Sequence, residues 1–433
     1  MRIYDIIEKK RDGRPLDGEE IAYFVRGFTA GEIPDYQASA LLMAIFLRGM
    51  DREELACLTR EMMLSGDTLD LTRFGEHTAD KHSTGGVGDK TTLIAAPIAA
   101  SLGCRIAKMS GRGLGFTGGT VDKLESIPGY RTVLSPEEFE SQVMETGIAV
   151  VGQSGSLAPA DKKLYALRDV TATIESIPLI ASSIMSKKLA AGSRNIVLDV
   201  KIGSGAFMKD LERGRELAET MVEIGKSCGR RVSAVLSNMD VPLGRAVGNA
   251  LEVRETVEIL QGRGDASLRA LCVELAAQMV SLSFERGIDE CRRDAAHAID
   301  SGSALAVFRR WIEAQGGDTA FVDDPATLCP AMIHHTLTAS SSGFVSGVNA
   351  SEVGRASMML GAGRETVGDV IDPSAGILLL KKPGDRVEAG EALAELFTSD
   401  GARVPEAAAV LERAVRIGED RPASQPLIFG VVS

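Results

Sequence analysis

Apolar residues recur at the spacing of an amphipathic helix through the first 65 residues of the chain. Ile21, Phe24, Val25 and Phe28 follow this spacing, and it continues through residues 41–47 and 55–64. Positions three and four apart lie on one face of a helix, so each of these segments can bury one side. The pattern predicts a small all-helical domain whose first part covers residues 1–65.

Beyond residue 70 the pattern changes to strand-like runs that alternate with helical segments, although residues 60–70 and 72–80 contain no strong strand. The candidate strands are residues 105–109, 148–151, 196–200 and 231–236. Such alternation is typical of a parallel sheet, so we expect a larger α/β domain in two parts, residues 70–155 and 195–334. Residues 160–191 return to a helical pattern and are expected to complete the helical domain.

A third pattern begins near residue 335. Short apolar runs between residues 376 and 396 are interrupted by turn sequences at 383–385 and 389–391, which predicts a C-terminal β-rich module over residues 335–433. Its Gly-Asp-x-Val-x-x-Gly-Glu-x-Leu sequence resembles the half-barrel of biotinyl and lipoyl carriers. No lysine stands at the expected hairpin tip, so a structural role is favoured over a carrier role.

The composition is that of a globular protein, with 44% hydrophobic and 25% charged residues in 433. This length favours two or three domains. No run of about 18 uninterrupted apolar residues is present, and the charged N-terminal segment does not resemble a secretory signal, so we expect a cytoplasmic protein. The six cysteines lie far apart, which favours reduced thiols over metal knuckles or redox motifs.

The net charge of −12 argues against nucleic acid as a partner, because binding to a phosphate backbone rests on clustered Lys and Arg. Between residues 81 and 123, however, six basic residues stand against two acidic ones. This local excess of positive charge predicts a site for a small anion.

Two glycine-rich stretches lie within this basic segment. Residues 81–92 (KHSTGGVGDKTT) lead into an apolar, helix-like run, and residues 108–125 (KMSGRGLGFTGGTVDKLE) follow a candidate strand. A glycine-rich turn that opens a helix leaves backbone N–H groups free to bind an anion. The Walker order is absent, so a nucleoside triphosphate is not indicated. One such loop alone could be a plain structural turn.

Together the two loops carry charged and neutral donors suited to one phosphate ion. Lys81 and Lys108 supply charge, and hydroxyl donors come from Ser83, Thr92, Ser110 and Thr120. Two loops that converge on one anion are the simplest interpretation.

These loops, with residues 162–173 (KKLYALRDVTAT) and 182–188 (SSIMSKK), resemble the pyrimidine-nucleoside and thymidine phosphorylase family. The resemblance runs along the whole chain, and residues 110–125 match the family's signature almost position by position. It implies a potassium-binding homodimer joined through the helical domains, with the active site between the helical and α/β domains. The substrates it implies are inorganic phosphate and a pyrimidine nucleoside.

The resemblance also implies roles for individual residues. Catalytic roles fall to His82, Arg168 and Lys187, and base binding to Arg168, Ser183 and Lys187. Phosphate contacts fall to Lys81, His82, Ser83, Thr92, Lys108, Met109, Ser110 and Thr120. Ser183 and Lys187 are four residues apart in a helix-like segment, so both could address one planar ligand. Taken singly, Arg168 and Lys187 could be solvated charges and His82 a turn cap.

For the cation, the resemblance points to Gly88, Lys90, Leu243, Ala246 and Glu255. Some relatives have a hydroxyl residue in place of Lys90, so any contribution from this residue must come from its backbone carbonyl. The nearby ammonium could partly substitute for the ion. Phe116 is a second departure, because relatives commonly carry histidine there, and it would alter the pocket wall.

The activity implied is reversible phosphorolysis. Phosphate attacks the anomeric carbon opposite the base and releases α-(deoxy)ribose 1-phosphate, and a closing motion of the two domains brings the substrates together. The choice among uridine, thymidine and deoxyuridine stays open. One alternative is an anthranilate-type phosphoribosyltransferase, which would need a divalent metal, and we find no acidic pair placed to carry magnesium after the second loop. Another is a non-catalytic nucleoside-binding protein.

Overall fold

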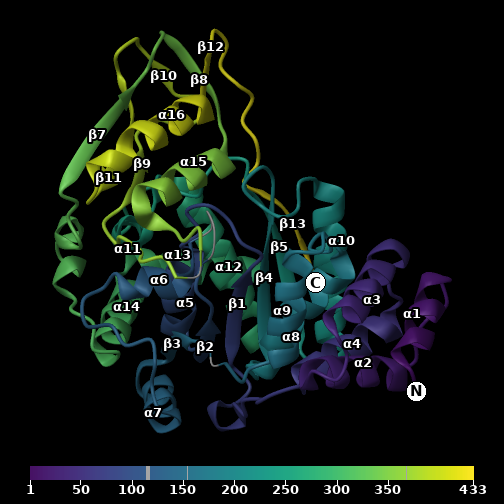
Figure 1. Ribbon diagram of the computed structural model, residues 1–433. Coiled ribbons are helices and arrows are strands. Elements are labelled where there is room, and N and C mark those ends of the chain that lie inside the picture. The colour runs from purple at the N-terminus through teal and green to yellow at the C-terminus, as the bar shows by residue number, and fades with distance from the viewer. Residues whose placement is uncertain (114–117, 154, 367) are drawn as a thin grey trace.

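The computed structural model describes residues 1–113, 118–153, 155–366 and 368–433. A helical unit, a central α/β unit and a C-terminal β-rich module follow one another across the molecule (Figure 1). This is the fold class that the sequence predicts.

The helical unit is built from amphipathic helices that bury a common apolar face. Two of them begin at capping boxes formed by Asp17 with Glu20 and by Asp51 with Glu54. In each box the aspartate side chain accepts the backbone N–H of the glutamate and the glutamate side chain accepts that of the aspartate, so N–H groups at the start of the helix are satisfied. The helices of the N-terminal part are α1 (Ile3–Arg11), α2 (Gly18–Ala30), α3 (Asp35–Arg48) and α4 (Arg52–Met63).

Helices α8 (Pro159–Asp169) and α9 (Ile177–Ala190) pack against this N-terminal part. Leu164 and Leu179 belong to the apolar core of the helical unit. Helix α9 also contributes Ala181 and Met185 to the core beneath the central sheet. Because α9 belongs to both cores, it fixes one wall of the space between the two units.

The central sheet has the order β1-β4-β5-β13. Its first three strands run parallel and are β1 (Ala79–Ser83), β4 (Asn195–Ile202) and β5 (Arg231–Asn238). Beside β1 lies the parallel pair β2 (Ile106–Ser110) and β3 (Ile148–Gly152), which a bridge between Thr78 and Arg105 connects to this sheet. The four predicted strands are present, and each end lies within two residues of the predicted one.

Strand β1 was not predicted. It starts inside the stretch judged to lack a strand, and its sequence, Ala-Asp-Lys-His-Ser, contains no β-branched residue. Asp80 and Lys81 are nevertheless buried, because both make ion pairs with residues far away in the sequence. Tertiary pairing thus overrides the local propensity of this segment.

Helices pack around the strands of the α/β unit and on one another (Figure 1). They are α5 (Thr91–Ser101), α6 (Thr120–Glu125), α7 (Pro136–Thr146), α10 (Leu211–Ser227), α11 (Asn249–Leu260), α12 (Ala266–Phe284), α13 (Ile288–Asp300) and α14 (Ser303–Ala314). Among the described residues, α12 alone has the length and apolar composition to cross a membrane, but it packs on α5, β4 and β5 as a core helix of this unit.

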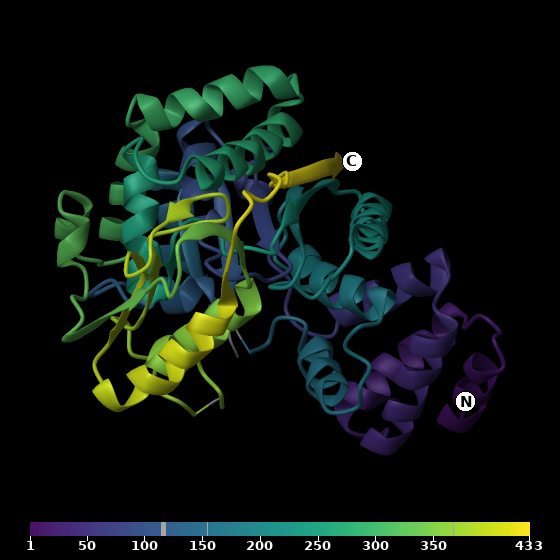
Figure 2. The ribbon, with the colours of Figure 1, turned by 90° about the horizontal axis from the view of Figure 1, so that it is seen from above.

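The C-terminal module is made of antiparallel strands and two helices. These are β7 (Ile333–Thr338), β8 (Gly343–Val348), α15 (Ala350–Ser357), β9 (Gly376–Leu379), β10 (Arg386–Val387), β11 (Ala392–Thr398), α16 (Val404–Ala414) and β12 (Val415–Gly418). The short strand β6 (Ala246–Val247) of the central unit pairs with β9. The chain then leaves the module, and β13 (Ile428–Val432) pairs with β5 at the edge of the central sheet (Figure 2).

This topology places both glycine-rich loops at one edge of the sheet. Strand β1 ends at Ser83 and leads through the first loop into α5, while β2 ends at Ser110 and leads through the second loop into α6. The carboxyl ends of parallel strands are the usual position of ligand sites in α/β folds.

Candidate active site

A cavity of about 640 Å³ lies between the loops at this edge and helices α8 and α9. Its α/β wall includes Lys81, His82, Ser83, Thr84, Asp89, Thr92, Lys108, Ser110, Arg112 and Thr120. Its helical wall includes Tyr165, Arg168, Asp169, Ile180, Ser183, Ile184 and Lys187. Every residue predicted to bind phosphate or base therefore lines this cavity, except Met109, whose carbonyl oxygen lies 3.5 Å from the Nζ of Lys188.

The first loop turns sharply so that the start of α5 faces the cavity. Gly85 has a φ of +101° and Gly88 a φ of +69°, conformations that favour glycine. The backbone N–H of Gly85 donates to the Ser83 hydroxyl at 3.2 Å. Helix α5 then begins at Thr91, and Thr92 in its first turn lines the cavity. The positive end of this helix favours an anion.

Lys81 lies beneath this loop rather than extending freely into the cavity. Its side chain is 1% exposed, its ammonium donates to the Thr91 hydroxyl, and Asp199 and Asp89 lie 3.3 and 3.8 Å away. Lys201 binds the same Asp199 carboxylate at 2.6 Å. These lysines and aspartates neutralise one another, so the cluster organises the loop and adds no net charge.

A second cluster supplies the excess charge. Lys108 and Lys188 each bind one oxygen of Asp80, both at 2.8 Å, which leaves one positive charge more than the carboxylate neutralises. Burial alone would raise the pKa of Asp80, but these two ammonium groups outweigh it and lower the pKa. Burial, partly offset by Asp80, lowers the pKa of Lys108 to about 8.

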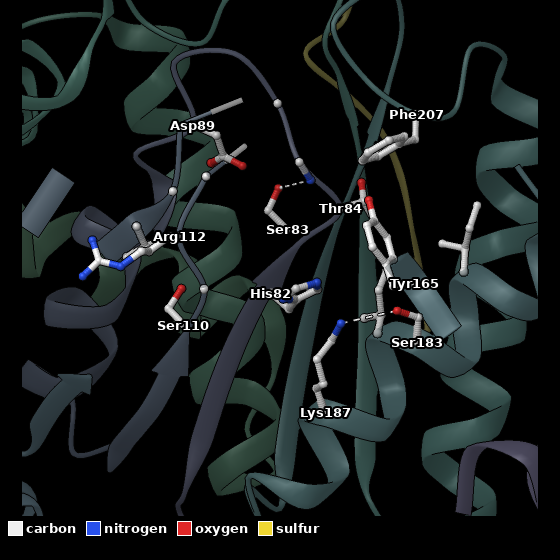
Figure 3. A pocket seen from close by; sticks show the side chains of 18 of the residues that line it. His82, Ser83, Thr84, Asp89, Ser110, Arg112, Tyr165, Ser183, Lys187 and Phe207 are labelled. Carbon is white, nitrogen blue, oxygen red and sulfur yellow. Dashed lines mark hydrogen bonds between the residues drawn. The ribbon is translucent and has the colours of Figure 1, made fainter. Parts of the chain in front are cut away.

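His82 lies between the two walls, with Ser110 on one side and Lys187 and Ser183 on the other (Figure 3). Burial, followed by the charges of Lys188 and Lys108, holds the pKa of His82 well below its usual value. The imidazole is therefore neutral at neutral pH, and it can donate or accept a hydrogen bond without carrying charge.

The helical wall presents two cations to the cavity. The ammonium of Lys187 donates to Asp161 at 2.6 Å and to the Ser183 hydroxyl at 3.3 Å, one helical turn away. The guanidinium of Arg168 donates to three backbone carbonyls, those of residues 173, 174 and 179, which holds it rigidly at the cavity wall. Burial lowers the pKa of Arg168 to about 10, so it remains charged at neutral pH.

Apolar and aromatic residues complete the cavity, and the sequence interpretation did not include them. Tyr165 precedes Arg168 by three residues in α8, and its ring centroid lies 6.0 Å from the guanidinium carbon. That helical spacing could have indicated it. On α9, Ile180 likewise precedes Ser183 by three residues, and Ile184 precedes Lys187 by three. Phe207, on the loop after β4, stands against Gly85 and had no sequence signal.

The acidic residues that follow the second loop are bound to arginines. Asp122 accepts a hydrogen bond from Arg364 of the C-terminal module at 2.9 Å, and the Glu125 carboxylate pairs with Arg112. Their charges are thus compensated, which does not favour a divalent cation between them. Phe116 lies outside the described residues.

The residues predicted to bind a potassium ion surround the side chain of Lys90. Its ammonium donates to the carbonyl oxygens of Leu243 and Ala246, both at 2.9 Å, and to the Glu255 carboxylate at 2.6 Å. The Gly88 carbonyl accepts the backbone N–H of the same lysine at 3.0 Å. With Lys90 in this position, potassium does not fit among these oxygens.

Comparisons with known families cover most of the chain. Residues 4–66 match the helical bundle domain and residues 75–305 the a/b domain of a glycosyl transferase family. Residues 344–418 match the pyrimidine nucleoside phosphorylase C-terminal domain.

Individual relatives extend this likeness. The chain is 52% identical to the pyrimidine-nucleoside phosphorylase of Geobacillus stearothermophilus, over 100% of both chains. It is 53% identical to the pyrimidine-nucleoside phosphorylase of Bacillus subtilis, over 92% of each chain. A crystal structure of anthranilate phosphoribosyltransferase from Thermus thermophilus shares the fold, with a TM-score of 0.59, 20% identity, and coverage of 71% of this chain and 98% of that one.

The pKa of Lys108 leads to a prediction about anion binding. Inorganic phosphate needs the charged ammonium, and its negative charge raises the pKa of Lys108 in the complex. Affinity is therefore highest below pH 8 and falls as the pH rises through the free-protein pKa of about 8. Calorimetric titration with phosphate should show a loss of about tenfold between pH 7.5 and 9.5 beyond that caused by ionisation of phosphate itself.

The matched control is Lys108→Arg, because a guanidinium keeps its charge over this range. The variant should lose this extra fall in affinity. An affinity for phosphate that is unchanged across the range in the wild type would contradict the role of Lys108.

Proposed function

The chain belongs to the pyrimidine-nucleoside phosphorylase family, and we propose that it cleaves pyrimidine nucleosides with inorganic phosphate to give the free base and α-pentose 1-phosphate. The observation that carries this proposal is the division of the cavity. One wall has the loops, helix start and lysines that suit an anion, and the other has cations and apolar side chains that suit a planar base.

Phosphate would lie against the two loops. The hydroxyls of Ser83, Ser110 and Thr120 and the first turn of α5 offer hydrogen-bond donors, and the pair of lysines on Asp80 adds charge. Lys81 contributes mainly by holding Thr91 and the loop in place. The chemistry balances without a covalent enzyme intermediate, because a phosphate oxygen bonds to the anomeric carbon while the carbon–nitrogen bond to the base breaks.

The departing base takes the electron pair of the broken bond. Lys187 and Arg168 would stabilise the negative charge that develops on its carbonyl oxygens, while Ser183 would hydrogen-bond its edge. Neutral His82, between the two walls, would donate a hydrogen bond rather than a full proton. Tyr165, Ile180 and Ile184 provide apolar surface for the ring.

The alternatives receive less support. The likeness to the phosphoribosyltransferase extends to the fold only, and the carboxylates after the second loop are compensated by arginines. A non-catalytic binding protein has no need for charges placed on both sides of a scissile bond. The presence of both sets of charged residues favours an enzyme, a pentosyltransferase.

Assembly and location are parts of the same proposal. We propose a homodimer through the helical units, supported by large apolar side chains exposed on their surface, among them Tyr36 and Leu47 at 74% and 70% exposure. We propose the cytoplasm as the compartment, supported by six free cysteines. The net charge of −12 supports small-molecule substrates rather than nucleic acid.

The proposed function predicts that cleavage consumes phosphate in equal amount with the nucleoside. Purified protein incubated with uridine, thymidine or deoxyuridine should release base only when phosphate is present, because the anion loops otherwise lack a ligand. Chromatography of base and pentose products measures this. Free pentose formed in phosphate-free buffer would identify a hydrolase instead.

A further prediction concerns the leaving group. Lys187→Ala should lower kcat for uridine about a hundred- to thousand-fold, because a preorganised cation near the base is lost. The loss should be smaller for 5-nitrouridine, whose base carries negative charge more easily. The test is to measure kcat for both substrates under conditions in which the chemical step is rate-limiting. Equal losses for both substrates would contradict the role of Lys187 in stabilising the leaving group.

Two further variants separate this role from structural effects. Asp161→Asn combined with Lys187→Ala removes the buried carboxylate that the single variant leaves unpaired. The double variant should keep the rate defect of Lys187→Ala. Lys163→Ala removes an exposed lysine of α8 whose one hydrogen-bond partner among the described residues is the Thr29 carbonyl, and it should leave both rates unchanged.

A further inference from the structure

The side chain of Lys90 is buried and lies at a junction of three chain segments. It is 0% exposed, although a lysine is almost never fully buried without partners. The residue immediately precedes α5, whose first turn lines the phosphate wall of the cavity. We infer that the ammonium of Lys90 is the monovalent cation of this enzyme, built into the chain, and that the enzyme does not depend on potassium.

The contacts of the ammonium support this inference. An ammonium group has three N–H donors, and Lys90 has three acceptors, the carbonyls of Leu243 and Ala246 and the carboxylate of Glu255. The distances of 2.6–2.9 Å are those of full hydrogen bonds. No donor is left over, so the lysine is satisfied in its present position.

The surrounding backbone leaves little room for a second cation. The carbonyls of Leu243 and Ala246 face Gly88 so closely that a Cβ there would lie 2.7 and 3.0 Å from them. A potassium ion sharing these oxygens would also stand beside the ammonium and repel it. The same oxygens therefore serve either the lysine or a free ion.

Glu255 ties the cation to the rest of this junction. Besides Lys90, its carboxylate accepts the backbone N–H groups of Arg245 at 2.7 Å and Ala246 at 3.0 Å. The turn over residues 243–246 is thus held from both sides. It leads directly into β6, which pairs with β9 of the C-terminal module.

The consequence is that Lys90 acts as a positioning residue for the first loop. Its side chain fixes the start of α5 to a turn and to helix α11, so the donors of Thr92 and the loop keep their orientation toward phosphate. A cation attached to the chain is present at every salt concentration, whereas a free ion must be bound from solution. Loss of Lys90 should therefore weaken phosphate binding more than nucleoside binding.

The experiment compares the wild type with Lys90→Thr. This variant replaces the ammonium by a hydroxyl and leaves the oxygens of Leu243, Ala246 and Glu255 free to bind an ion. The thermal unfolding midpoint and the KM values for phosphate and nucleoside are measured in potassium chloride and in tetramethylammonium chloride at equal ionic strength. In the wild type, both salts should give the same midpoint and the same KM values.

Lys90→Thr should depend on potassium. In tetramethylammonium chloride its KM for phosphate should rise about tenfold or more, with a smaller change in the KM for nucleoside. Potassium should restore the KM and raise the midpoint by about 2 °C or more. The matched control, Lys382→Thr, removes a lysine that pairs with Asp265 at 2.7 Å. Because no backbone carbonyl of the described residues accepts a hydrogen bond from its ammonium, potassium should not stabilise this variant.

Two results would overturn the inference. One is a wild-type protein that potassium stabilises or activates beyond the tetramethylammonium control, as the family resemblance alone leads one to expect. The other is a Lys90→Thr variant that potassium stabilises no more than Lys382→Thr. The wild-type comparison holds even if Lys90→Thr does not fold.

The KM measurements rest on the proposed function, whereas the measurements of the thermal unfolding midpoint do not. If the protein lacks phosphorolytic activity but shows the expected potassium response of the midpoints, the proposed function fails while the built-in cation stands.

Discussion

The anion wall depends on buried lysines that make ion pairs with carboxylates. A buried ammonium is tolerated only where oxygen atoms accept its hydrogen bonds, so each lysine must reach a carboxylate on another segment of the chain. The pairs are Lys81 with Asp199, Lys90 with Glu255, and Lys108 with Asp80. They connect β1, β2, the start of α5, β4 and α11, and they hold both glycine-rich loops at one edge of the sheet.

Charge balance then decides what the cavity can bind. The Lys81 cluster is neutral overall, whereas Asp80 is shared by two lysines and leaves one positive charge. This charge lowers the pKa of His82 further and keeps the imidazole neutral. On the opposite wall, α9 is part of both apolar cores, so Lys187 and Ser183 stand on a helix that both units hold in place.

The sequence was informative where local patterns decide structure. Helical periodicity predicted the helical unit, and alternation predicted β2, β3, β4 and β5. It did not predict β1, because long-range ion pairs stabilise Asp80 and Lys81 there. For the same reason it did not single out Lys188, whose role appears only through Asp80, nor the inward direction of the Lys90 side chain. The return of β13 to the central sheet also depends on a distant pairing.

The most direct test of the account is product analysis with phosphate labelled in all its oxygens. The account predicts that a phosphate oxygen forms the new bond to the anomeric carbon and inverts it. Nuclear magnetic resonance of the product should therefore show α-pentose 1-phosphate with the label in the bridging oxygen. A β-configured product, or a bridging oxygen without label, would contradict the proposed arrangement of phosphate and base on opposite walls of the cavity.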